Sequence, residues 1–260
     1  MDNVKDLIQN AHEEGSLSDD SMDLLKNIDL GAQIQAAMGI PAMEAPTSEV
    51  ILITCLLDDS GSICAAGNEQ VVREGYNMIL DALMATKQKE SIYVHTRYIN
   101  GKILHPYMPL TQAPRLDSSN YQANGGTPLY DETAVMLATV VAKTQEYSTQ
   151  GISVRAISVI VTDGHDQHSV KFVSTDIKPL VDDMLMSESH IIAAMGIDDR
   201  LTNFVRVFGE MGLKKEWILT PKNSAHDIRA AFRTVSQSAV RTSQAANFNS
   251  AAMGGFGTNP

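Results

Sequence analysis

Short, continuous hydrophobic runs alternate with amphipathic stretches along residues 50–240. Such runs are typical of strands buried on both faces, and an apolar residue at every third or fourth position is typical of a helix packed on one side. Six strands are predicted, at 50–57, 91–99, 102–110, 155–162, 190–197 and 216–220. The spacing of Val72, Tyr76, Ile79, Leu80 and Leu83 predicts a helix between the first two strands. Further helices are predicted at 129–147, near 176–186 and around 201–211. A last helix is predicted from Ser224, where Ser224 and Asp227 fit a capping box.

The order of these elements predicts an α/β fold. Strands that alternate with helices form a parallel sheet covered by helices, so we expect a doubly wound, mainly parallel sheet of about six strands with helices on both faces. Asn100-Gly101 separates two of the β-rich runs, and this dipeptide is the strongest short hairpin signal. One antiparallel edge strand is therefore expected beside the parallel strands.

Four segments differ in pattern and charge. Residues 1–40 are predicted to form an acidic helical arm, 41–49 a proline-containing linker, 50–241 the main domain, and 242–260 a flexible tail without charged residues. The apolar faces of the arm are predicted at Val4, Leu7, Ile8 and Ala11, and at Met22, Leu24, Leu25 and Ile28. The arm is expected either to pack on the domain as a structural collar or to serve as a second docking arm.

Charge and composition exclude several classes of function. The net charge is −11, and residues 1–49 hold ten acidic and two basic residues, so no basic surface for nucleic acid is expected. No signal peptide and no apolar stretch long enough to span a membrane is visible. The two cysteines, Cys55 and Cys64, are expected to stay reduced in a chain without an export signal. These features predict a cytoplasmic protein.

Two acidic residues follow buried strands of the predicted sheet. Asp58 comes directly after the strand at 50–57, and Asp163 after the strand at 155–162. In an open α/β sheet, ligands bind at the carboxyl ends of the strands, where the strand order reverses. Asp58, Ser60 and Ser62 occupy alternate positions, so their oxygens can converge on one point. Such hard oxygen donors favour Mg²⁺ or Mn²⁺, with Ca²⁺ as an alternative.

Asp58-x-Ser60-x-Ser62, Thr127 in GGTPL and Asp163 in VTDG resemble the metal-ion-dependent adhesion site of von Willebrand factor A (vWA) domains, with the whole motif present. The resemblance covers roughly residues 49–240 and is to the cytosolic prokaryotic type. It implies a Rossmann-like vWA fold in which a partner's carboxylate completes the coordination of a magnesium ion. It further implies that the two serines and the threonine bind the ion directly, and that the two aspartates act through water or by their charge.

Each part of this pattern also has a structural explanation. Thr127 could be the N-cap of the following helix, with Pro128 at its first position. His165, Asp166 and His168 could form a solvated rim or hold a second metal. Asp59 lies between the ligand positions and is expected to point away from the ion. The joint arrangement at strand ends favours a metal site formed by Asp58, Ser60, Ser62, Thr127 and Asp163.

The favoured function is a non-catalytic, metal-dependent protein-binding module that serves as an adaptor or chaperone-like subunit. Its partner would present an Asp or Glu, and the resemblance suggests a MoxR-type AAA+ ATPase or the kinase and phosphatase modules of tellurite-resistance-like systems. Two alternatives stay open: a Mg²⁺-dependent hydrolase or phosphotransferase, and a structural subunit whose metal only stabilises loops. Against the enzyme, no phosphate-cradling glycine loop with a lysine is present.

Overall fold

A six-stranded sheet in the order β3-β2-β1-β4-β5-β6 forms the centre of the protein. In this computed structural model the described residues are 4–26, 30–42, 48–245, 248 and 253–256. The strands are β1 (Glu49–Leu57), β2 (Ile92–Tyr98), β3 (Ile103–Pro109), β4 (Ser153–Thr162), β5 (His190–Gly196) and β6 (Ile218–Leu219). All neighbours pair in parallel except β2 and β3, which form the predicted antiparallel hairpin. The predicted sheet is confirmed.

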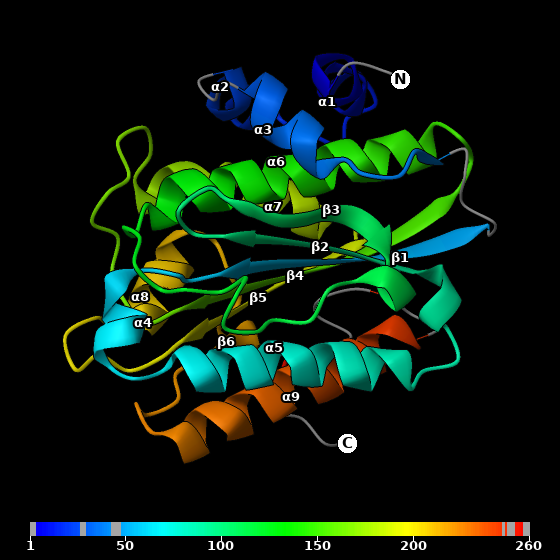
Figure 1. Cartoon of the computed structure of the whole chain (residues 1–260). Coiled ribbons are helices and arrows are strands. Elements are labelled where there is room, and N and C mark those ends of the chain that lie inside the picture. Colours follow the sequence, from blue (N-terminus) through cyan, green and yellow to red (C-terminus); the bar gives the residue numbers. More distant parts are fainter. Residues whose placement is uncertain (1–3, 27–29, 43–47, 246–247, 249–252, 257–260) are drawn as a thin grey trace.

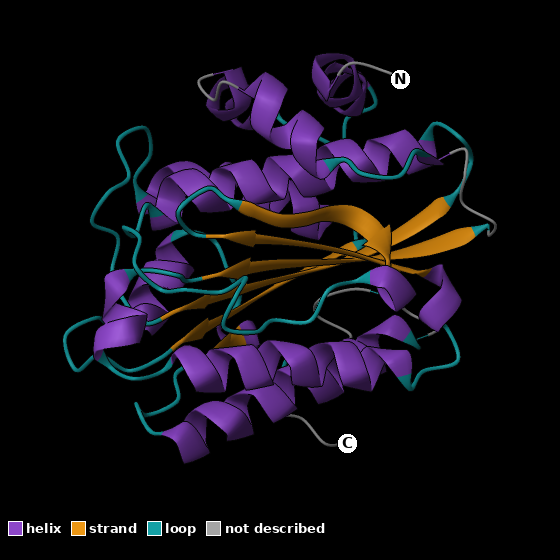
Figure 2. Ribbon diagram, viewed as in Figure 1, coloured by secondary structure: helices purple, strands orange, loops and turns teal. Residues whose placement is uncertain are grey.

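Helices cover both faces of the sheet, which gives the three layers seen in Figure 2. One face carries α6 (Leu129–Ser148), α7 (Ser174–Met186) and α8 (Phe204–Glu210), and the other carries α5 (Glu69–Met84) and α9 (Ala225–Ser243). The side chains of β1 alternate between the two layers: Val50, Leu52 and Leu56 pack toward α6, whereas Ile51, Ile53, Cys55 and Leu57 pack toward α5 and α9. A strand between two helical layers has apolar side chains on both of its faces, so its sequence is a continuous hydrophobic run.

Most predicted helices agree with the structure to within a residue or two, and α8 is the exception. The sequence predicts a helix from about residue 201, but α8 begins at Phe204. The carboxylate of Asp199 accepts hydrogen bonds from the backbone of Leu201 and Thr202, which holds this segment in a turn. Asn203 then caps the helix by accepting from the backbone nitrogen of Arg206 at 3.0 Å.

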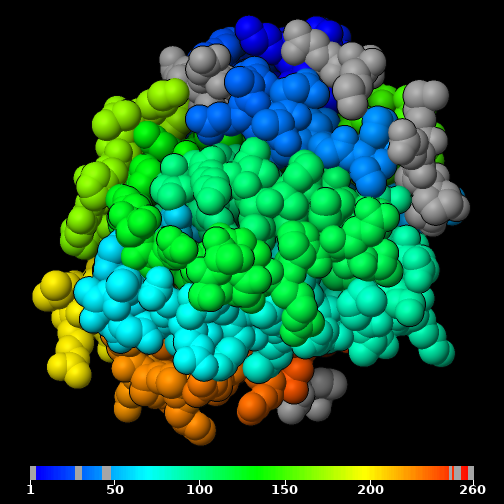
Figure 3. All heavy atoms as spheres, viewed as in Figure 1, coloured from blue at the N-terminus to red at the C-terminus, as the bar shows by residue number. Residues whose placement is uncertain are grey.

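Three helices of the N-terminal arm pack on the outside of the α6 layer (Figure 1). They are α1 (Val4–Glu13), α2 (Asp19–Lys26) and α3 (Leu30–Ala37), and the sequence predicted only the first two. The predicted apolar residues of α1 are all buried, in one cluster with residues of α6 and β1. Ile28, predicted for the second apolar face, lies outside the described residues. In the space-filling view the arm lies directly against the segment that contains β3 (Figure 3).

A buried charge holds the end of the arm on the domain. The ammonium group of Lys143 is fully buried and donates to the backbone oxygen of Ile40 at 2.5 Å and to Glu146 at 2.7 Å. Glu146 in turn accepts from the backbone nitrogen of Ala42 at 3.2 Å. Burial lowers the pKa of Lys143, which the neighbouring Glu146 opposes. The arm therefore packs as a collar, the first of its two predicted roles, while a docking role stays a prediction.

Part of the segment predicted to be a flexible tail has defined contacts, while residues 246–247, 249–252 and 257–260 lie outside the described residues. The helix α9 continues to Ser243, past the predicted boundary at 241. Phe256 then packs edge-on against Trp217, with ring centroids 5.3 Å apart, and its backbone nitrogen donates to Glu216 at 2.9 Å. These contacts arise because Phe248, Met253 and Phe256 all pack against the apolar cluster that includes Trp217.

Gly39 allows the arm to approach β3 closely. Its φ is +62°, and a Cβ there would lie 1.9 Å from the backbone oxygen of Tyr107. We expect Gly39→Ala to lower the free energy of unfolding by roughly 3 kcal/mol or more, because a left-handed backbone and a steric clash both oppose the new side chain. Urea unfolding measures this change.

Gly15→Ala is the matched control. Gly15 has a similar φ of +79°, but nothing lies within 4 Å of a Cβ there. Its substitution should cost only about 1–2 kcal/mol, the cost of the backbone conformation alone. Equal losses for the two variants would contradict the close packing of the arm on β3.

Candidate metal site

The parallel pairing of β1 with β4 brings Asp58 and Asp163 to the same edge of the sheet. Leu57, the last residue of β1, pairs with Val161, one residue before the end of β4. The backbone nitrogen of Asp58 donates to Val161 at 2.9 Å. The strand order reverses here, because β1 leads to β2 on one side while β4 lies on its other side. This is the switch point at which open α/β sheets bind ligands.

The carboxylate of Asp58 is fully buried and organises the loop that follows β1. Its Oδ1 accepts from the backbone nitrogen of Ser60 at 2.8 Å, which turns the chain into the short helix α4 (Gly61–Ala65). Its Oδ2 accepts from the hydroxyl of Thr162 at 2.5 Å. Asp58 thus orders the loop after β1 through one oxygen and links the two strand ends through the other.

A chain of hydroxyl groups connects the loop after β1 to Asp163. The Oγ atoms of Ser60 and Ser62 are 2.9 Å apart. The hydroxyl of Ser62 donates to Oδ1 of Asp163 at 2.6 Å. Hydrogen bonds therefore connect four of the five predicted ligands: Asp58, Ser60, Ser62 and Asp163.

The fifth predicted ligand, Thr127, is brought to the site through backbone contacts. Gly125 forms a bridge with Ser60, accepting from the backbone of Gly61 at 3.0 Å and donating to that of Asp59 at 2.9 Å. Thr127 itself is 4% exposed. Among the described residues, no hydrogen bond to its hydroxyl is found, so the structure places Thr127 beside the other four without a direct bond to them.

The alternative role of Thr127 as a helix cap does not fit the structure. Helix α6 begins at Leu129 with Pro128 at the cap position, and the backbone nitrogens of Tyr130 and Asp131 donate instead to the hydroxyl of Ser169 at 3.1 and 3.0 Å. The backbone of Thr127 is instead held by the loop after β4. Its nitrogen donates to Nδ1 of His168 at 2.9 Å, and its oxygen accepts from the backbone nitrogen of Gln167 at 3.1 Å. The hydroxyl is thus left available to a ligand.

Each member of the His165, Asp166 and His168 cluster has a different environment. His168 positions Thr127 and packs so closely that a Cβ on Gly126 would lie 3.0 Å from its ring. Asp166 accepts from the hydroxyl of Ser169 at 2.5 Å and from two backbone nitrogens, which fixes the loop. His165 is exposed. The cluster is therefore a structured rim of the site, and a second metal there has no support in these contacts.

Three buried carboxylates lie close together at this edge without a basic partner. Asp58, Asp59 and Asp163 are 0%, 2% and 4% exposed. None of the ion pairs in the described part of the chain involves them. Burial, reinforced by the charge of Asp58, raises the pKa of both Asp59 and Asp163 to about 6. Full ionisation of the site is therefore unfavourable unless a cation is present.

Asp59 points away from the hydroxyl groups, as the sequence predicts. Its Oδ1 accepts from the backbone nitrogen of Asn100, in the β2–β3 turn, at 3.2 Å. This bond ties the hairpin to the loop after β1. Asp59 therefore adds negative charge near the site while its side chain orders the neighbouring turn.

The donor set fits a small, hard cation. Neighbouring ligands of an octahedral magnesium ion lie about 3 Å apart, because each metal–oxygen distance is about 2.1 Å. The Ser60–Ser62 and Ser62–Asp163 oxygen pairs, at 2.9 and 2.6 Å, are close to that spacing. Within the described ranges, no group of three or more His, Cys, Asp or Glu side chains could hold a metal. A cation at this site would thus depend on the hydroxyl oxygens as well as on Asp58 and Asp163.

Sequence reasoning missed three residues that shape the site: Thr162, His168 as a positioning residue, and Tyr121. The hydroxyl of Tyr121 donates to the backbone oxygen of Asp58 and is fully buried, and burial raises its pKa well above the ordinary value. Tyr121 and His168 contact the site from loops that are distant in the sequence, so no local sequence pattern predicts their roles. Thr162 directly precedes Asp163, so a hydroxyl at the last position of the strand is a signal that could have been considered.

The comparisons with known proteins support the fold. No protein-family model and no curated protein matches the sequence. Among solved structures, the pilus adhesin SpaC from Lactobacillus rhamnosus GG matches with a TM-score of 0.50 and 10% identity over 74% of this chain and 31% of its own. The SpRpn10 VWA domain matches with a TM-score of 0.49 and 11% identity over 81% of this chain and 100% of its own.

A third similar structure is proximal thread matrix protein 1 from the mussel byssus, whose metal-ion-dependent adhesion site is occupied by zinc. It matches with a TM-score of 0.46 and 15% identity, over 74% of this chain and 46% of its own. The chain thus spans about a third of the pilus adhesin and less than half of the byssus protein. The sheet order and the helices on both faces show a vWA-like α/β fold, as predicted, and the match to the pilus adhesin supports the fold. No helix in the described ranges is long and apolar enough to cross a membrane.

His168 provides a test of how the site positions Thr127. We expect His168→Ala to weaken magnesium binding about tenfold, because residues that orient metal ligands typically contribute 10- to 100-fold to affinity. His165→Ala is the matched control, since His165 is exposed and its side chain forms no hydrogen bond with a described residue. Calorimetric titration with Mg²⁺ measures both variants, and equal affinities for the two would refute the positioning role.

The raised pKa values predict how stabilisation by metal depends on pH. Without a cation, the pKa of Asp59 and Asp163 is about 6 in the folded state, against ~3.9 in the unfolded chain. Their contribution to stability is therefore present below about pH 4 and is lost as the pH rises through about 6. A divalent cation favours the ionised carboxylates and reverses this loss. The difference in Tm between excess Mg²⁺ and EDTA should thus be small near pH 5 and grow toward about pH 7.5. A constant difference would contradict this coupling.

Proposed function

We propose that the chain is a divalent-metal-dependent protein-binding module, an adaptor or chaperone-like subunit without catalytic activity of its own. Magnesium is the ion we infer, held by Asp58, Ser60, Ser62, Thr127 and Asp163. An Asp or Glu side chain of the partner completes its coordination. The observation that carries this proposal is the mixed donor set: two carboxylates linked to neutral hydroxyls at the switch point of the sheet.

The charge of this donor set explains why an external carboxylate would bind. Two carboxylates and three hydroxyls are too few and too weakly charged to saturate a magnesium ion, which takes six oxygen ligands in an octahedral arrangement. The ion therefore keeps an open position and enough positive charge to attract an anionic oxygen. Ser62 is exposed and its loop faces solvent, so a partner can reach this edge.

The same proposal includes the kind of partner. We propose a protein that presents an acidic side chain, such as a MoxR-type AAA+ ATPase or a kinase or phosphatase module, in the cytoplasm. The mainly acidic arm packs on α6 and α7 and would provide a second surface for such a partner.

Affinity capture tests this function with matched variants. The full-length chain is immobilised in Mg²⁺, and bound protein is eluted with EDTA. Ser60→Ala/Ser62→Ala removes two ligand oxygens, whereas Ser118→Ala changes an exposed serine outside the site. We expect binding of the captured partner to fall at least tenfold, about 1.4 kcal/mol, for the double variant and to be unchanged for Ser118→Ala.

A second step identifies the contact. Asp→Asn or Glu→Gln substitutions in the captured partner should include one that abolishes metal-dependent binding while its neighbours have no effect. Retention of the partner in EDTA, or by the double variant, would favour a structural role for the metal. Hydrolysis of phosphoesters by the purified protein, lost in Asp58→Ala, would replace the binding proposal with an enzymatic one.

A further inference from the structure

An open groove of about 350 Å³ lies between helix α2 of the arm and the loop that joins β4 to α7. One wall is formed by Asp20, Asp23 and Leu24 of α2. The other wall is formed by the end of the loop, at residues 171–172, and by the first turns of α7. None of the five proposed metal ligands lines this groove, so it is separate from the metal site.

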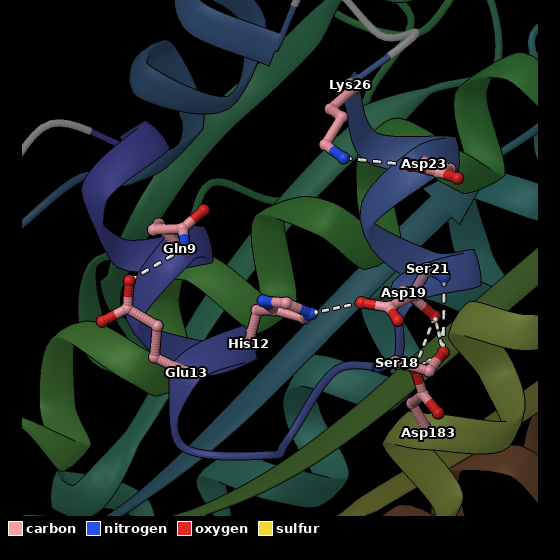
Figure 4. Close-up of polar contacts among 9 residues, drawn as sticks. All are labelled: Gln9, His12, Glu13, Ser18, Asp19, Ser21, Asp23, Lys26 and Asp183. Carbon is pink, nitrogen blue, oxygen red and sulfur yellow. Dashed lines mark hydrogen bonds and ion pairs between the residues drawn. The ribbon is translucent and has the colours of Figure 1, made fainter.

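Helix α2 is fixed in place by contacts at its N-terminus. Figure 4 shows that Ser18 and Ser21 both point at Asp183 of α7. The backbone nitrogen and the hydroxyl of Ser18 each donate to this carboxylate at 2.7 Å, and the hydroxyl of Ser21 donates at 2.5 Å. His12 of α1 contacts Asp19 of α2 at 2.9 Å, which joins the two helices across the turn between them. The arm wall of the groove is therefore ordered before a partner binds.

The other wall of the groove is held by a carboxylate of α6. Asp131 accepts hydrogen bonds from the backbone nitrogens of three consecutive loop residues, Val170, Lys171 and Phe172, at 3.0, 3.2 and 3.0 Å. A partner that binds against this preformed loop does not have to order it, which lowers the entropic cost of binding. Both walls of the groove therefore have fixed backbones.

The loop presents apolar side chains to solvent beside the groove. Val170 and Val173 are 88% and 58% exposed, and they flank Lys171 and Phe172 in the sequence. Leu24 and Phe172 line the groove itself and are nearly buried. A single exposed valine is ordinary, but two of them on a fixed loop next to an apolar-lined groove indicate a contact surface.

The lining of the groove carries a net negative charge. It includes three aspartates and one lysine: Asp20, Asp23, Asp176 and Lys171. Asp23 forms an exposed ion pair with Lys26 at 3.0 Å (Figure 4), which is a weak interaction. Asp20 is exposed and is in none of the ion pairs found in the described part of the chain. The groove therefore repels phosphates and anionic lipid headgroups and attracts a basic side chain.

We propose that this groove docks a protein segment in which an arginine or lysine lies between apolar residues. The apolar stem of the basic side chain packs along Leu24 and Phe172, and its charged end reaches Asp20. The flanking apolar residues cover Val170 and Val173. A cavity of about 150 Å³ already accommodates benzene, so the groove has room for one long side chain. This docking requires no metal and gives the arm a role beyond its packing on the domain.

Titration of the ¹⁵N-labelled full-length protein with short peptides, followed by NMR of its amides, tests the kind of partner. The probe is an acetylated and amidated glycine–serine peptide with leucine-arginine-leucine at its centre. Serine replaces both leucines in a second peptide, and glutamine replaces the arginine in a third. In EDTA, the first peptide should bind about tenfold more tightly than the other two, because only it combines apolar cover with a cation.

The outcome of this titration is independent of the proposed metal-dependent function. None of the three peptides carries a carboxylate, and EDTA removes any divalent cation. Equal affinities for the three peptides, or no binding by any of them, would overturn the docking proposal and leave the metal proposal intact.

Matched variants test the location. Val170→Ser/Val173→Ser removes the exposed apolar side chains, and Met186→Ser is its control, because Met186 is 80% exposed on α7 but does not line the groove. We expect the first peptide to bind about fivefold more weakly to the valine variant and normally to the control. Asp20→Asn should weaken both arginine peptides about threefold. Its control is Asp6→Asn, since Asp6 is also an acid in the first turn of an arm helix but lies outside the groove.

Thermal unfolding confirms that the four variants fold. Equal affinities for each variant and its control would place the binding elsewhere on the protein and overturn the proposal.

Discussion

The parallel pairing of β1 with β4 is the constraint on which the site depends. Both strands are buried on both faces, so the register between them is fixed by two hydrophobic layers at once. Because Leu57 lies beside Val161, Asp58 follows at the level of Thr162, and Asp163 comes one residue later at the same edge. The hydrogen bond from Thr162 to Asp58 then fixes the relative position of the two strand ends. A metal site formed by short loops can be well ordered only if such strands position it.

The charge at this edge follows from the same packing. The sheet and its loops bury three carboxylates that form no ion pair within the described part of the chain, and burial raises the pKa of two of them to about 6. This arrangement is unfavourable for the folded protein alone. A cation at the site would make it favourable, and this is the physical basis of the proposed metal site.

Local patterns predicted the fold well, and long-range contacts account for the positioning residues that they missed. The alternation of apolar runs identified the strands, and Asn100-Gly101 identified the hairpin, because these signals lie within a few residues. The positioning roles of His168 and Tyr121 depend on contacts 41 and 63 residues apart in the sequence, and no periodicity records them. The packing of the arm by Lys143 was missed for the same reason: a lysine in a helix is normally exposed, and here it is fully buried. The five-ligand assignment itself stays a prediction.

The location of the ion is the most direct test of the account. Crystals grown with Mn²⁺ would show it as an anomalous scattering peak. The account predicts a peak within coordination distance of the hydroxyl oxygens of Ser60 and Ser62 and beside Thr127, lost in crystals of Ser60→Ala/Ser62→Ala. A peak elsewhere on the protein with none between these loops, while Asp58 and Asp163 keep their positions, would contradict the metal site and the function proposed from it.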